Sequence, residues 1–219
     1  MYSWNTIETE ILAAMLHRRP DLEPCTGAMA QFHEALVSCY DNGRVLYTCG
    51  NGGSNADALH IVGELCKSFE RKRPLDKAFK TRLVSLPHGD ELAAHLEAGL
   101  PSVALGLNSP LKTAIENDSP LPNIAFAQEL HALMKPCDVM LAISTSGKAV
   151  NCLMAMSVAK AMGGTAAVLT GQDGGLMAHH ADIVIRAPGN DTKEIQEAHV
   201  VIWHTLCCLI EAHYFPEKR

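Results

Sequence analysis

The chain alternates short apolar runs with longer amphipathic stretches over most of its length. Apolar runs rich in β-branched residues predict strands, and stretches with an apolar residue every three or four positions predict helices. Strands that alternate with helices favour a parallel sheet whose right-handed crossovers place helices on both faces. The expected strands cover residues 44–49, 102–107, 138–143, 165–170 and 182–187, and the expected helices cover 54–71, 89–98, 110–116, 123–134, 147–162 and 192–214.

Two regions lie outside this alternation. Residues 1–42 show helical spacing that Pro20 interrupts, which predicts N-terminal helices packed against the sheet or against a partner. Residues 67–101 contain three prolines and many charges, and they predict an insertion between the first helix of the sheet and its second strand. The chain as a whole, 1–219, is expected to form a single doubly wound α/β domain with five strands.

Composition narrows the class of protein. The net charge is −6 and the longest basic run is Arg71-Lys72-Arg73, so nucleic acid is not an expected partner. No apolar run reaches the roughly 20 residues that span a bilayer, which argues against a membrane protein. The eight cysteines form no CxxC pair and the N-terminus has no signal-peptide pattern. These features predict a protein of the reducing cytoplasm.

Two turns of small residues each follow a predicted strand and open a predicted helix. They are GNGGS at 50–54 and STSG at 144–147. Free backbone N–H groups and hydroxyls at the start of a helix favour anions, phosphate above all. Either turn alone is as easily an ordinary connection, but two turns at the carboxyl edge of one parallel sheet favour a phosphate cradle.

Histidine and glutamate side chains lie downstream of the first turn. His60 and Glu64 are four residues apart and share a helix face, so they can ligate zinc or a similar ion, or form a base with its orienting partner. An exposed His/Glu pair is the plain alternative. In the last helix, His199 and His204 stand in an apolar segment, where an imidazole needs hydrogen-bond partners. His213 is expected at the surface.

These motifs together resemble the bacterial phosphoheptose isomerases of the SIS, or sugar-isomerase-domain, group. The resemblance runs from about residue 30 to the C-terminus. It rests on GNGGSNADALHIVGEL at 50–65, STSG at 144–147, LTGQDGG at 169–175 and EIQEAHVVIWH at 194–204. It implies a flavodoxin-like sheet, a homotetramer with active sites at subunit interfaces, and a divalent metal, usually zinc.

The resemblance also implies roles for individual residues. Glu64 corresponds to the general base and His204 to its acid/base partner. The implied metal ligands are His60, Glu64, Gln196 and His204. The implied substrate and phosphate contacts are Asn51, Gly52, Ser54, Asp118, Ser144, Thr145, Ser146 and Gln196.

One part of this ligand set is geometrically awkward. Gln196 and His204 are eight residues apart, about 12 Å along a straight helix and about 80° around it. Both reach one ion only if it lies between them or if subunits share the site. His199 lies three residues from Gln196 on the same face and is the rival ligand. The preference for His204 comes from the resemblance.

The sequence departs from the family pattern close to the expected substrate. Ser68, beside Lys67, stands where many members have arginine, and Lys193 stands where an acidic residue is common. Lys148 and Ala149 follow STSG, and Ala149 replaces a serine. Asn108 occupies the place of an aspartate, and the 67–101 insertion is longer than usual. These changes bear on which sugar is bound more than on the His/Glu/Gln/His set.

The predicted function is isomerisation of a ketose phosphate, sedoheptulose 7-phosphate or a close relative, to the aldose phosphate through an enediol. The alternative is a non-catalytic SIS module that binds a sugar phosphate and regulates a protein partner, as replication-initiator-associated relatives do. The His60, Glu64, Gln196 and His204 set favours catalysis, because a pure binder needs no proton-transfer groups.

Overall fold

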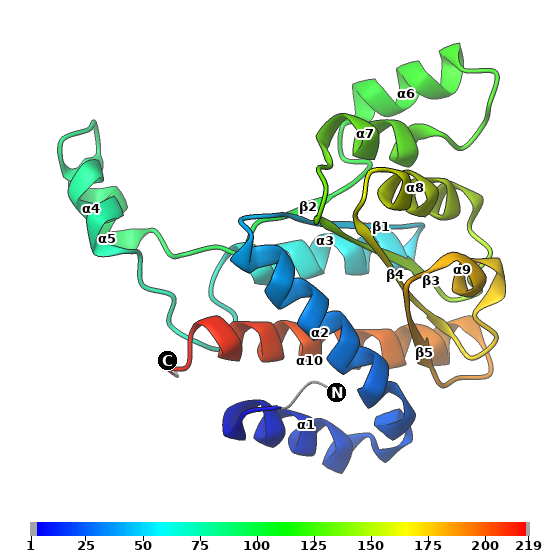
Figure 1. Ribbon diagram of the computed structural model, residues 1–219, viewed down its shortest axis with the longest axis horizontal. Helices are drawn as coiled ribbons and strands as arrows, with labels where there is room; N and C mark the ends of the chain where they lie inside the picture. The colour runs from blue at the N-terminus through cyan, green and yellow to red at the C-terminus, as the bar shows by residue number, and fades with distance from the viewer. Residues whose placement is uncertain (1–3, 218–219) are drawn as a thin grey trace.

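The computed structural model describes residues 4–217 and shows one five-stranded parallel sheet (Figure 1). The strand order is β2-β1-β3-β4-β5, the flavodoxin-like arrangement in which the order reverses beside the first strand. The predicted α/β fold class is therefore confirmed. The strands are β1 (Leu46–Gly50), β2 (Ser102–Ala104), β3 (Val139–Ser144), β4 (Thr165–Gly171) and β5 (Ile183–Ala187).

Helices cover both faces of the sheet. None of those within residues 4–217 is both long and apolar enough to cross a bilayer. The α-helices are α1 (Thr6–Arg18), α2 (Thr26–Asp41), α3 (Gly53–Cys66), α4 (Lys77–Val84), α5 (Gly89–His95), α6 (Ser109–Asp118), α7 (Ala125–Leu133), α8 (Val150–Ala161), α9 (Gly175–His180) and α10 (Thr192–Tyr214), with a 3-10 helix η1 (Pro20–Cys25) after α1.

Side chains that alternate along the strands separate two apolar cores. In β3, Leu141 and Ile143 pack among α2, α3 and α10, whereas Met140 and Ala142 pack among α7 and α8. The central strands are buried on both faces, so they appear in the sequence as continuous apolar runs rather than alternating ones. The long α10 lies along the first face, and α1 packs against its outer side (Figure 1).

Some elements differ from the prediction in their bounds, and two helices were not expected. The first helix of the sheet ends at Cys66 rather than at residue 71, because Glu211 of α10 accepts hydrogen bonds from the backbone N–H groups of Phe69 and Glu70. β2 is shorter than expected, and the chain turns at Gly106, whose φ is +88°. α4 and α9 were not expected; Asp76, which caps α4, was the available signal.

The predicted insertion, 67–101, holds α4 and α5 on an arm that projects from the body (Figure 1). The root of the arm is firmly attached. The buried Arg73 side chain donates to Glu211 and to the backbone carbonyl oxygens of Glu64 and Leu65. The tip carries exposed apolar side chains, including Val84 and Leu86.

Candidate active site

The two small-residue turns meet at one cavity of about 430 Å³ at the carboxyl edge of the sheet. β1 and β3 are hydrogen-bonded neighbours, so the turns that follow them lie side by side. Six of the predicted substrate and phosphate contacts line this cavity, which we call the cradle: Asn51, Ser54, Ser144, Thr145, Ser146 and Gln196.

The two helices that begin at the cradle have no side-chain cap. α3 begins after Gly52, whose φ of +54° suits glycine, and α8 begins after Ala149. By contrast, Asn5 caps α1 and Asp191 caps α10. Both helices begin at the cavity, so the positive ends of two helix dipoles favour an anion there. The N–H groups of Ser54 and Asn55 donate to the backbone carbonyl oxygens of Asn51 and Gly52, and that of Cys152 donates to the Asn151 side chain.

Contacts between distant segments shape the cradle wall. Asn51 and Asn151 exchange side-chain hydrogen bonds of 2.9 and 2.8 Å, which join the first turn to α8. The Gln196 amide lies against Gly53, where an added Cβ would come within 2.5 Å of its nitrogen. Glycine at this position thus leaves room for Gln196. The roles of Asn151 and Thr192 in this wall were not anticipated, because each acquires its place only through tertiary packing.

The proton-transfer candidates gather farther along α3 and α10. Nε2 of His60 lies 3.0 Å from Oε1 of Glu64, and the His60 and His204 rings lie 5.3 Å apart at their centroids. Burial lowers the pKa of His204, and the neighbouring His60 lowers it further. At neutral pH His204 is therefore mainly uncharged.

The rival histidine lies elsewhere. His199 is fully buried, and burial lowers its pKa to about 4. It is a neutral histidine of the core, whereas His204 faces His60. Asp118 ends α6, where it accepts a hydrogen bond from Asn117 and does not line the cradle. Its predicted substrate contact stays a prediction.

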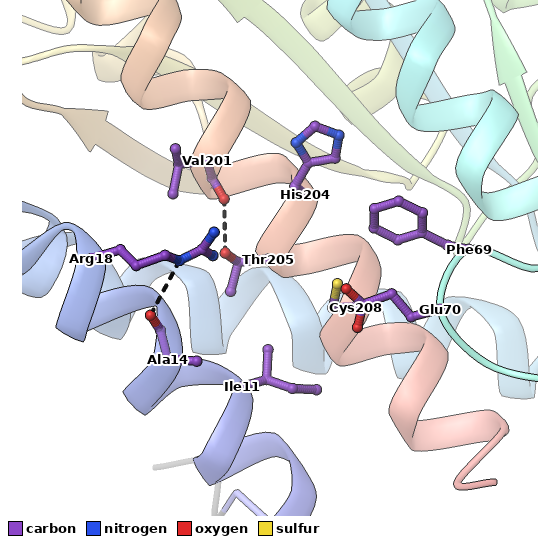
Figure 2. Close-up of a pocket in the computed structure, with 9 residues that line it drawn as sticks. All are labelled: Ile11, Ala14, Arg18, Phe69, Glu70, Val201, His204, Thr205 and Cys208. Atoms are coloured by element: carbon purple, nitrogen blue, oxygen red, sulfur yellow. Dashed lines mark hydrogen bonds between the residues drawn. The ribbon is translucent and has the colours of Figure 1, made fainter. Parts of the chain in front are cut away.

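A second cavity, of about 310 Å³, opens beside His204 between α1 and α10 (Figure 2). Figure 2 shows the Phe69 ring facing His204 from the root of the arm, with Arg18 reaching in from α1. The Phe69 and His204 rings are stacked, with their centroids 5.6 Å apart. The cavity gives solvent or a substrate a route to the imidazole from outside the cradle.

The predicted metal ligands are only partly assembled. His60 and Glu64 lie within hydrogen-bonding distance, with Nε2 and Oε1 3.0 Å apart, and both residue types are ones that zinc binds. The His204 ring lies next to the His60 ring, with 5.3 Å between their centroids, whereas Gln196 lines the cradle. A different group brings its ligand atoms closer together. Within residues 4–217, Glu8, His33 and His213 place ligand atoms within 4.8 Å of one another, which is compatible with a metal ion.

The structure shows what contacts are made at two of the places where the sequence departs from the family pattern, residues 67–68 and residue 148. Ser68 bonds Glu97 of the arm, while Lys67 forms an ion pair of 3.2 Å with Glu64, so a cation still faces this carboxylate. Lys148 lines the cradle and lies 3.9 Å from Asp173. It adds positive charge where an anion is expected.

Comparison with known proteins shows the family and the same fold. SIS domain models match residues 22–98 and 121–208. The phosphoheptose isomerase of Geotalea daltonii is 38% identical over 85% of this chain and 84% of its own length, and that of Shewanella baltica is 35% identical over 98% and 93%. The structure of phosphoheptose isomerase GmhA from Neisseria gonorrhoeae superposes with a TM-score of 0.70 at 27% identity, covering 93% of this chain and 96% of that one. The Francisella tularensis phosphoheptose isomerase gives 0.69 at 30% identity, covering 92% and 93%.

The five-stranded sheet and the paired turns at its carboxyl edge define a SIS-domain protein. Within that class, α3 carries His60 and Glu64 beyond the cradle, and α10 carries Gln196 in the cradle wall and His204 farther along. The chain belongs to the phosphoheptose isomerases, a family of isomerase enzymes.

Proposed function

We propose that the protein converts sedoheptulose 7-phosphate, or a close ketose relative, to the corresponding aldose phosphate, of the D-glycero-D-manno-heptose 7-phosphate type. The observation that carries this proposal is the alignment of the cradle with the His60/Glu64/His204 cluster along two packed helices. Glu64 lies ten residues beyond Ser54 on α3, about 15 Å along the axis. His204 lies eight residues beyond Gln196 on α10, about 12 Å. A phosphorylated sugar presents its anion and its reacting carbons at opposite ends, so an anion site and proton-transfer groups at separate points of the same two helices suit it.

The chain's own residues account for binding and proton transfer. The cradle holds the distal phosphate and fixes the reacting carbons without taking part in the chemistry. Glu64 removes a proton from C1 of the ketose, and His204 serves as the acid/base partner for the return of a proton at C2. The C1–H bond breaks and a C2–H bond forms, while the hydroxyl proton passes from O1 to O2 through the enediol, so the atoms of ketose and aldose balance. Lys67 lies 3.2 Å from Glu64 and places a positive charge beside this base.

A divalent metal, with zinc as the proposed ion, fits the donor chemistry of this cluster. His60 and Glu64 would hold it, with His204 and Gln196 as the further ligands that the family resemblance implies. When bound, such an ion polarises the sugar carbonyl and stabilises negative charge on oxygen.

The decisive experiment follows deuterium from solvent into sugar. Sedoheptulose 7-phosphate incubated with the protein in deuterium oxide should yield an aldose phosphate labelled at C2, detected by NMR. Label also enters C1 of the ketose when the reaction reverses. Absence of label at both carbons, with sugar-phosphate binding retained, would instead support the regulatory binding module.

Lys148 should contribute to substrate affinity rather than to turnover. Replacing Lys148 by Gln removes a positive charge from the cradle and should raise KM about fivefold, equivalent to about 1 kcal/mol, with kcat unchanged. The difference should shrink at high salt, because the side chain is exposed. Steady-state kinetics at two ionic strengths measure both effects. Lys160→Gln, at the far end of α8, is the control.

We propose a homo-oligomer, a tetramer as in the family resemblance, in which the arm contacts a second copy of the chain. The support is apolar surface on a projecting element: Phe79, Val84, Leu86, Leu92 and Leu96 are all exposed on the arm. Such a cluster on an element that projects from the body is typical of an interface.

Charging the arm tip should weaken this assembly. Val84→Lys with Leu86→Lys should lower the mass measured by light scattering at micromolar protein, because two apolar contacts are replaced by like charges. Glu91→Gln, an exposed change on the same arm, should leave the mass unchanged. An unaltered assembly in the lysine variant would place the interface elsewhere.

We place the enzyme in the cytoplasm. All eight cysteines are free thiols in the structure, and most are buried, where they act as small apolar side chains. Such cysteine use suits a reducing compartment.

A further inference from the structure

A second His/Glu cluster lies where α1, α2 and the last turn of α10 meet. Glu8 comes from α1, His33 from α2 and His213 from α10. The side chains of Glu8 and His33 are fully buried, and that of His213 is 30% exposed. His213 was expected at the surface; its contact with Glu8 places it at the edge of this cluster instead.

The separations within the cluster are those of ligands around a small ion. Oε1 of Glu8 lies 3.5 Å from Nε2 of His33 and 3.4 Å from Nδ1 of His213. Zinc binds imidazole nitrogen and carboxylate oxygen at about 2.0–2.2 Å, so neighbouring atoms in a tetrahedral site are about 3.4 Å apart. A charge-assisted hydrogen bond would be shorter, about 2.7–2.9 Å. The distance from the carboxylate oxygen to each imidazole nitrogen therefore matches the distance between two neighbouring ligands of a tetrahedral zinc ion.

Neighbouring groups orient and shield the potential ligand atoms of this cluster. The His33 ring is fully buried beside Glu8, and a neutral imidazole nitrogen can donate its lone pair to an ion. The second oxygen of Glu8, Oε2, accepts a hydrogen bond of 2.9 Å from the backbone N–H of Asn5, which orients the carboxylate. The Trp4 ring packs on His33, with centroids 5.1 Å apart, and shields the cluster on that side.

We propose that Glu8, His33 and His213 form a divalent-metal site, separate from the active site, whose preferred ion is Zn²⁺. Two imidazoles and one carboxylate are a recognised zinc donor set, and the exposed edge at His213 admits water as the fourth ligand. The ion ties the N-terminal helices to the end of α10, which also carries Glu211, the anchor of the arm. Its role is therefore to stabilise the scaffold around the active site.

Zinc binding to the full chain tests this site directly. A chain carrying His60→Ala and His204→Ala removes the active-site imidazoles, so remaining zinc reports on the new site. After chelation and dialysis, titration with Zn²⁺ followed by calorimetry should give one ion per chain. Co²⁺ in place of Zn²⁺ should give the visible absorption of a tetrahedral site.

Adding Glu8→Gln to that background should weaken zinc binding by more than the roughly 10–100-fold that loss of an outer partner costs. Glu10→Gln, an exposed change on the same helix, should leave binding unaltered. If Glu8→Gln fails to fold, His213→Gln at the partly exposed edge replaces it, with His17→Gln as control.

The outcomes separate a metal site from a hydrogen-bonded network. Zinc should raise the Tm of the background chain and not that of the Glu8 or His213 variant. If the background binds no zinc, or if these variants bind it as well as the background, the cluster is a carboxylate–imidazole network only and the proposal is wrong. Neither result depends on isomerase activity.

Discussion

Glu64→Gln is expected to abolish isomerisation while leaving recognition of the phosphate intact. The amide keeps the shape of the side chain and its place beside His60, but it cannot accept the C1 proton. General-base catalysis contributes about 10²–10⁴-fold, so kcat should fall by that factor. Binding of inorganic phosphate should change less than about twofold, because the cradle lies about 15 Å away along α3.

NMR of the aldose product measures turnover, and calorimetry with phosphate measures the cradle. Glu23→Gln, an exposed change in η1, is the control for general loss of negative charge. Metal content must be measured on the same preparation, since Glu64 is also a proposed ligand. A variant that binds phosphate weakly yet turns over normally would remove Glu64 from the role of base.

Sequence periodicity predicted most of the fold because the strands carry their signal locally. β3 and β4 are strands of six and seven residues whose central positions, 139–143 and 166–169, are apolar and buried. The two unexpected helices, α4 and α9, are too short to carry such a local signal. α9 has six residues, fewer than two full helical turns, and a segment this short does not show a helical spacing of apolar residues.

The cradle was predictable for a similar reason, whereas the metal chemistry was not. Each turn is a contiguous motif, and parallel topology places both turns at one edge. Thr192 lines the cavity from the start of α10, and Asn151 of α8 bonds Asn51, so both take part only once these helices have packed. Glu8, His33 and His213 come from three separate helices, and no spacing in the sequence links them. Tertiary packing alone creates that cluster.

The Arg73–Glu211 ion pair should be the costliest polar contact to break. Both side chains are fully buried, with Nε and Oε1 2.7 Å apart. Glu211→Gln leaves the guanidinium without a counter-charge and presents an amide where Phe69 and Glu70 donate N–H groups. Loss of one partner of a buried pair costs about 3–5 kcal/mol, which in a domain of this size lowers Tm by about 10 °C.

The exposed pair Arg19–Asp21 provides the matched control, also at 2.7 Å. Asp21→Asn should cost less than about 1 kcal/mol, since water screens that contact. The double change Arg73→Met with Glu211→Met should recover only part of the loss, because the N–H groups of the arm root still lack their acceptor. Thermal unfolding of all three variants measures the costs. If Glu211→Gln were as mild as Asp21→Asn, the ion pair would not anchor the arm, and the position of Glu64 at the end of α3 would need another support.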